Sequence, residues 1–127
     1  MVEVLVENKS RIIPDQYIFD IISLITERYL AEGKIILVMS ERNSRKLGEC
    51  IPKSLLEYAK RESFFREYLN EKWDAGVIIY PKACKYYEDY PAFFTYLLGH
   101  EFGHAYACLK DENLHLFYCL IQDFIKE

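Results

Sequence analysis

The stretch His100-Glu101-Phe102-Gly103-His104 has the residue types and the spacing that a zinc hydrolase requires. At about 3.6 residues per turn, positions i and i+4 of a helix lie on the same face. His100 and His104 can therefore hold one tetrahedral Zn²⁺ ion through their ring nitrogens. Glu101 is rotated by about 100° from His100, which places its carboxylate beside the ion. The pattern predicts hydrolysis by metal-activated water, with Glu101 as the general base.

Catalytic zinc usually takes three protein ligands, so a third side chain is needed. The chain has 3 histidines, and His115 is the one outside the motif. If the helices before and after residue 110 pack antiparallel, His115 lies within about 3 Å of His104 along the helix axis. We predict His115 as the third metal ligand, and Asp111 and Asp123 remain as alternatives.

The purely structural interpretation of the motif is a buried helix in which the two histidines are hydrogen-bonded in the core. It explains neither the spacing of the two histidines nor the presence of Glu101 between them. Cys108 lies four residues after His104 on the same helix face, so its thiolate could approach the metal. A core cysteine at the end of a helix is the more common case. A fourth ligand such as Cys108 or Cys119 would close the coordination sphere and favour a structural site.

Length and composition indicate a single domain over residues 1–127 with one hydrophobic core. Hydrophobic residues make up 51% and aromatic residues 16% of the chain, which argues against disorder. The net charge of −4 gives no basic surface for nucleic acid or an anionic membrane. No apolar run is long enough for a membrane span, and no signal peptide opens the chain. The 4 cysteines are scattered, so we expect reduced thiols and a cytoplasmic protein.

Hydrophobic periodicity predicts alternating strands and helices. We expect strands over residues 2–6, 35–39 and 76–80, and helices over 14–31, 54–72, 91–109 and 112–125, of which 54–72 could divide into two helices near Ser63. Residues 40–48 are expected to form an exposed loop or hairpin, and residues 82–90 a loop. Gly33 is expected to end the first helix as a C-terminal cap. The predicted fold class is α+β: a small mixed sheet packed against a backing helix and a central helix that carries the histidine motif.

The stretch 91–109 is apolar nearly all round, which predicts a buried central helix. Gly103 inside it costs about 1 kcal/mol relative to alanine, so we expect another backbone to pack close there. The strand 76–80 leads into this helix. We expect it either to border the cleft and pair with an extended peptide, or to be an ordinary interior strand.

At His100, Glu101 and His104 the chain resembles the zincin metallopeptidases. The resemblance implies a single-domain, zincin-like zinc hydrolase that cleaves a peptide or protein substrate. Metzincins have a glycine and a ligand where this chain has Ala107 and Lys110, so it is not a regular metzincin. One class of gluzincins has a ligand glutamate where this chain has Asp123.

Two closer resemblances involve the residues around the motif. The run 111–115, Asp-Glu-Asn-Leu-His, looks like the one that follows the motif in a family of short bacterial zincin-like proteins. The strand 76–80 together with the run 98–104 looks like the ImmA/IrrE group of regulatory peptidases. That group has its third ligand, a glutamate, well downstream of the motif, at a place that would fall beyond Glu127.

Three classes of function follow from these patterns. The first is a zinc-dependent metallopeptidase. The second is a non-catalytic module of zincin fold that binds metal or a partner, or a fragment that lacks its third ligand. The third, metal-dependent RNA cleavage, is disfavoured by the acidic charge. The helix 112–125 is apolar on more than one side, so self-association or a partner at this helix is expected.

Overall fold

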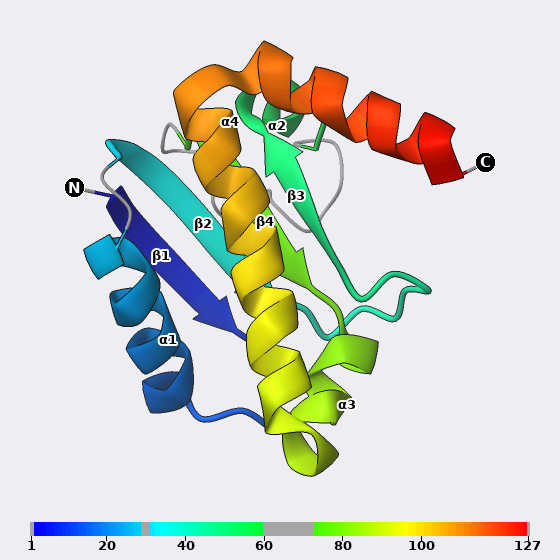
Figure 1. Cartoon of the computed structure of the whole chain (residues 1–127). Helices are drawn as coiled ribbons and strands as arrows, with labels where there is room; N and C mark the ends of the chain where they lie inside the picture. Colours follow the sequence, from blue (N-terminus) through cyan, green and yellow to red (C-terminus); the bar gives the residue numbers. More distant parts are fainter. Residues whose placement is uncertain (1, 29–30, 60–72, 127) are drawn as a thin grey trace.

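The computed structural model describes residues 2–28, 31–59 and 73–126. Figure 1 shows these residues as one domain, in which a sheet lies behind a layer of helices. In the last part of the chain, after Asp111, only the side chain of His115 is described. The prediction of an α+β fold with a small mixed sheet is confirmed.

The sheet has the strand order β1-β2-β4-β3. Its strands are β1 (Val2–Asn8), β2 (Gly33–Met39), β3 (Gly48–Pro52) and β4 (Ala75–Ile79). Strands β1, β2 and β4 are parallel, and β3 runs antiparallel to β4 at the edge. All residues of β4 are buried, which explains why its sequence is continuously apolar.

The helices are α1 (Asp15–Arg28), α2 (Lys53–Ala59), α3 (Pro81–Asp89) and α4 (Pro91–Lys126). Helices α1, α3 and α4 cover one face of the sheet, whereas α2 contacts β3 and β4. In α4 the side chains of Phe94, Leu98 and Phe102 are fully buried. They are four residues apart and form one apolar stripe, so packing against the sheet holds this helix in place.

Three predictions about local structure were wrong. The segment 82–90, predicted as a loop, lies mostly in α3, which begins at Pro81 and buries Ala83 and Cys84. Strand β3 was not predicted, because its five residues include a glycine, a glutamate and a terminal proline and show no continuous apolar run. Gly33 does not cap a helix; it is the first residue of β2, with φ of +149°.

Strand β4 lies between β2 and β3, so of the two alternatives the ordinary interior strand is confirmed and pairing with a substrate is excluded. Its hydrogen-bonding edges are already occupied on both sides. The antiparallel strand β3 takes the place at the edge of the sheet and lies beside α4. Of the predicted helix 54–72, residues 60–72 lie outside the described part of the chain.

The part of α4 from residue 91 to residue 111, whose side chains the structure describes, is buried on one side only, which corrects the prediction of a helix buried all round. Tyr96 is 65% exposed, and no heavy atom of the described residues lies within 4 Å of a Cβ built on Gly103, so none of their backbone packs there. At Asp111 the backbone leaves helical geometry, with φ of −158° and ψ of 97°. Beyond it, α4 turns away from its first part and runs across the end of the sheet near β3 (Figure 1). Among the residues that the structure describes, no helix is long and apolar enough to cross a membrane.

Candidate metal centre

His100 and His104 lie one turn apart on α4 and face each other. Their Nε2 atoms are 3.1 Å apart, and the ring planes are nearly perpendicular, at 86°. Two ligand nitrogens bound to one tetrahedral zinc ion lie about 3.3 Å apart, because each Zn–N bond is about 2.0 Å. The two imidazoles therefore have a separation that suits a shared zinc ion.

His115 lies next to His104, but a kink at Asp111 brings it there and not the predicted antiparallel pair of helices (Figure 1). Its Nε2 atom is 3.0 Å from Nδ1 of His104. In a straight helix, positions 104 and 115 would be about 16 Å apart along the axis. The non-helical backbone at Asp111 is what turns the chain so that the third imidazole can reach the first two.

The three imidazoles form a row with His104 in the middle. His104 uses Nε2 toward His100 and Nδ1 toward His115, so the three rings do not point at one common atom. In agreement, no group of three or more His, Cys, Asp or Glu side chains among the described residues is arranged to hold a metal ion. The donor chemistry suits zinc, but a three-histidine site requires the ring of His115 to move to the other side of His104.

Burial lowers the pKa of His104, and the neighbouring His100 and His115 lower it further. Burial also lowers the pKa of His115. Both imidazoles are therefore neutral at pH 7. Neutral imidazole is the form that binds metal, since a protonated ring has no free lone pair.

Glu101 lies half-buried against β3. Its Cγ atom is 3.2 Å from a Cβ built on Gly48, so the absence of a side chain at Gly48 leaves room for Glu101. Burial, and to a lesser degree the charge of Glu49, raise its pKa to about 7. A carboxylate with such a pKa is a stronger base than an ordinary glutamate and suits proton transfer near neutral pH.

Glu49 on β3 is a site residue that the sequence did not reveal. Its Oε2 atom accepts a hydrogen bond of 2.5 Å from the hydroxyl of Tyr80 and lies 3.7 Å from Nζ of Lys46. These contacts hold a second carboxylate close enough to affect Glu101. Recognising it from the sequence would have required predicting β3.

A cavity of about 270 Å³ opens between β3, α2 and α4. Its lining residues are Cys50, Pro52, Leu55, Glu101, His104, Cys108 and His115. Three of the four predicted site residues thus line one cavity, and His100 is exposed beside them. Asp111 is exposed at the kink and does not line this cavity, and the side chains of Cys119 and Asp123 lie outside the described residues.

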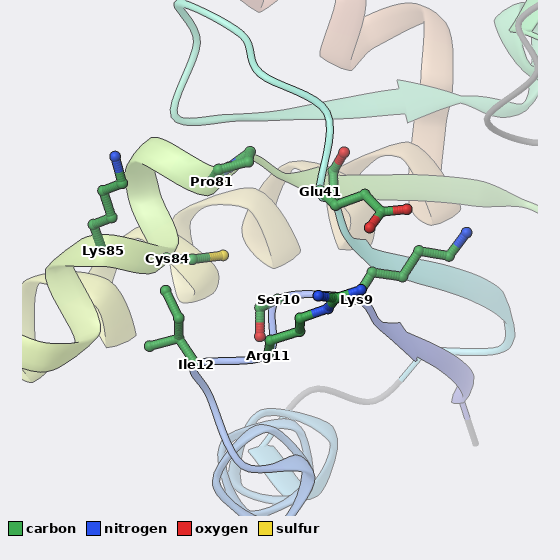
Figure 2. Close-up of a pocket in the computed structure, with 9 residues that line it drawn as sticks. Lys9, Ser10, Arg11, Ile12, Glu41, Pro81, Cys84 and Lys85 are labelled. Atoms are coloured by element: carbon green, nitrogen blue, oxygen red, sulfur yellow. The ribbon is translucent and has the colours of Figure 1, made fainter.

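A second cavity, of about 280 Å³, lies at the carboxyl ends of the three parallel strands. Figure 2 shows the sulfur of Cys84 pointing toward the loop that carries Ser10 and Arg11. Burial raises the pKa of this thiol to about 11, so it is not a reactive thiolate at neutral pH. None of the predicted site residues lines this cavity.

A scan of protein-family models and searches of curated proteins and solved structures found no match to this chain. The resemblance to zincins therefore depends on the motif His100, Glu101 and His104 and its neighbouring residues. Any function has to be argued from the geometry of these side chains.

Proposed function

We propose that this protein is a small zinc-dependent metallopeptidase that works in the cytoplasm. The observation that carries the proposal is the pair of Nε2 atoms of His100 and His104, 3.1 Å apart, next to the half-buried Glu101. Cys50, Cys84 and Cys108 carry thiols rather than disulfides, which suits a reducing compartment.

In the proposed reaction His100 and His104 would hold the metal ion, since their Nε2 atoms lie 3.1 Å apart. A zinc ion at this place would polarise the scissile carbonyl and make the attacking water more acidic. Glu101 accepts the proton of that water and then passes it to the nitrogen of the leaving amine. In the metal-free protein burial raises the pKa of Glu101 to about 7, and a bound cation would lower this pKa and favour the carboxylate that accepts the proton.

His115 is the proposed third ligand. If it binds the ion directly, His115→Ala should abolish tight zinc binding. If it only fixes the ring of His104 through Nδ1, the same substitution should weaken binding by roughly 10- to 100-fold. Glu88→Gln serves as the control, because Glu88 is exposed on α3 and lies outside the cavity lining; its zinc affinity should be unchanged.

The first experiment is a zinc titration of metal-free protein by calorimetry, followed by assays on a mixture of peptides. Glu101→Gln should keep one tight zinc site and lose hydrolysis, whereas His104→Ala should lose both. Glu88→Gln, an exposed acid on α3, is the matched control and should behave as the wild type. Hydrolysis by a clean Glu101→Gln preparation would refute the mechanism.

A second candidate function is a non-catalytic metal site, which the cysteines in the same cavity favour. Cys50 and Cys108 line it together with His104 and His115, residue types found in closed structural zinc sites, although in this structure these side chains are not arranged around one ion. Cobalt substitution tests this idea, because thiolate ligation gives a sulfur-to-metal charge-transfer band. Loss of that band in Cys108→Ser would support the structural site; a cobalt spectrum without it would support the peptidase.

A further inference from the structure

Four aromatic side chains form a stripe on the outer side of α3 and α4. The stripe consists of Tyr86, Tyr90, Phe93 and Tyr96. Tyr90 is 64% exposed, Tyr96 65% and Phe93 39%. Tyr86 is half-buried and also packs against the core, so it anchors the stripe to the domain.

The rings of the stripe are in contact with one another and with the candidate metal centre. Ring centroids are 4.8 Å apart between Tyr86 and Phe93 and 6.4 Å apart between Phe93 and Tyr96. Tyr96 in turn stacks on His100 at 6.1 Å, with 26° between the planes. This order follows from helix geometry, because positions 93, 96 and 100 lie on one face. The stripe therefore leads directly to the proposed site of hydrolysis.

The physical character of the stripe limits what it can bind. Aromatic rings exposed in a contiguous patch favour contact with apolar groups, since covering them removes apolar surface from water. Their mutual stacking restricts ring motion before binding, so less entropy is lost when a ligand covers them. The net charge of −4 disfavours polyanions such as nucleic acid, although bases also stack on aromatic rings.

We propose that this aromatic stripe binds apolar, and preferentially aromatic, side chains of the peptide substrate on one side of the bond to be cleaved. The inference rests on the proposed peptidase function and names its substrate class. Tyr96 is the central residue, because it touches both Phe93 and the ring of His100. A peptide lying along α4 would place side chains on the stripe while its backbone reaches Glu101.

The test compares two peptide series that differ only in carrying Phe or Ser at the positions flanking the cleaved bond. The wild type should prefer the Phe series in kcat/KM, and Tyr96→Ala should reduce this preference by roughly 2- to 12-fold, mainly through KM. Tyr96→Phe should retain the preference, because the ring remains. Phe19→Ala, an exposed aromatic on α1 away from the stripe, is the matched control and should change nothing.

Binding to the Glu101→Gln protein separates this proposal from the peptidase proposal. If the wild type cleaves no peptide but Phe peptides still bind and this binding depends on Tyr96, the peptidase proposal is refuted and the proposal for the aromatic stripe is supported. If the wild type cleaves the Phe and Ser series equally and Tyr96→Ala changes neither, the stripe proposal is overturned and the peptidase stands. Tyr96-dependent binding of single-stranded oligonucleotides, with no binding of Phe peptides, would also overturn it.

Discussion

The two sides of the α3–α4 layer use aromatic residues in opposite ways. On the inner side, Tyr87 and Phe94 pack with Tyr17 of α1, with ring centroids 4.9 to 6.3 Å apart. On the outer side, their immediate neighbours Tyr86 and Phe93 belong to the aromatic stripe. One residue along a helix rotates a side chain by about 100°, and this rotation separates core from surface.

The comparison shows that aromatic content alone does not distinguish the core from a binding surface. Phe94 is 0% exposed and Phe93 39%, although they are the same residue type at adjacent positions. The inner group joins α1, α3 and α4, whereas the outer group contacts α3, α4 and the candidate metal centre. We therefore expect substitutions inside to affect folding and substitutions outside to affect binding.

The largest difference is expected between Phe94→Ala and Phe93→Ala. Loss of the fully buried ring of Phe94 should reduce the free energy of unfolding by about 3–5 kcal/mol, because it leaves a cavity. Loss of the partly exposed ring of Phe93 should cost about 1 kcal/mol or less. Urea unfolding followed by circular dichroism measures both values. Equal losses would contradict the division into an inner and an outer side.

The rate at which Cys84 reacts with an alkylating reagent measures how readily the inner side of the α3–α4 layer opens to solvent. Its side chain is 1% exposed and burial raises its pKa to about 11, so little thiolate exists near neutral pH. Alkylation of Cys84 at pH 8 should be slower on the order of 100-fold in the native protein than in urea. Mass spectrometry of the labelled peptides identifies the modified cysteine. Rapid native labelling of Cys84 would show that this side opens readily.

Glu101 lies between the two sides, and its effect on stability should depend on pH. In the metal-free folded protein the pKa of Glu101 is raised from 4.5 to about 7. Between these two pH values Glu101 is therefore protonated in the folded state and ionised in the unfolded state. The stability contributed by the protonated group is complete below pH 4.5 and is lost as the pH rises through about 7.

The variant Glu101→Gln should lack this pH dependence. Because the pKa values of His104 and His115 are lowered, these groups reduce stability as the pH falls below 6.5, in the opposite sense. Both proteins contain the two histidines, so subtracting the unfolding free energy of the variant from that of the wild type removes the contribution of these histidines. Urea titrations of both proteins between pH 4 and 8 provide the measurement, and a pH-independent difference would refute the shifted pKa.

The smallest effect concerns a hydrogen bond that fixes the inner aromatic group. Thr95 donates its hydroxyl proton to the carbonyl of Pro91 at 2.9 Å, so its oxygen accepts the hydroxyl of Tyr17 at 2.6 Å. Tyr17→Phe should lower the unfolding free energy by about 1 kcal/mol. A double-mutant cycle with Thr95→Val isolates the pair, and additive effects would show that the bond contributes nothing.

The sequence predicted well those elements whose apolar pattern is long and regular. Strands β2 and β4 and the first part of α4 contain uninterrupted or strictly periodic apolar residues, and the structure confirms them. Strand β3 has the same length as β4 but contains Gly48, Glu49 and Pro52 in place of a continuous apolar run, and helix α3 has only nine residues. The three tyrosines of residues 86–90 obscured the apolar side of α3, which is formed by Ala83 and Cys84.

The candidate site was predicted in part, for a comparable reason. The spacing of His100, Glu101 and His104 is local, so helix geometry alone brings them together. The approach of His115 was predicted from an antiparallel pair of helices about a tight turn near residue 110; the structure has a kink at Asp111 in one helix, which brings His115 to His104 by a different path (Figure 1). Glu49 could not be anticipated, because its proximity to Glu101 depends on the pairing of an edge strand.

The position of β3 also determines when the site can form during folding. Gly48 and Glu101 lie against each other although about 50 residues separate them in the chain, so their contact closes a long loop. The parallel pairing of β1, β2 and β4 is also non-local, and such contacts form slowly. The four strands precede α4 in the chain, so they are synthesised before the helix that covers their apolar face. The contact between Gly48 and Glu101 exists only when the sheet and α4 are packed together, so the surroundings that raise the pKa of Glu101 are complete only in the folded domain.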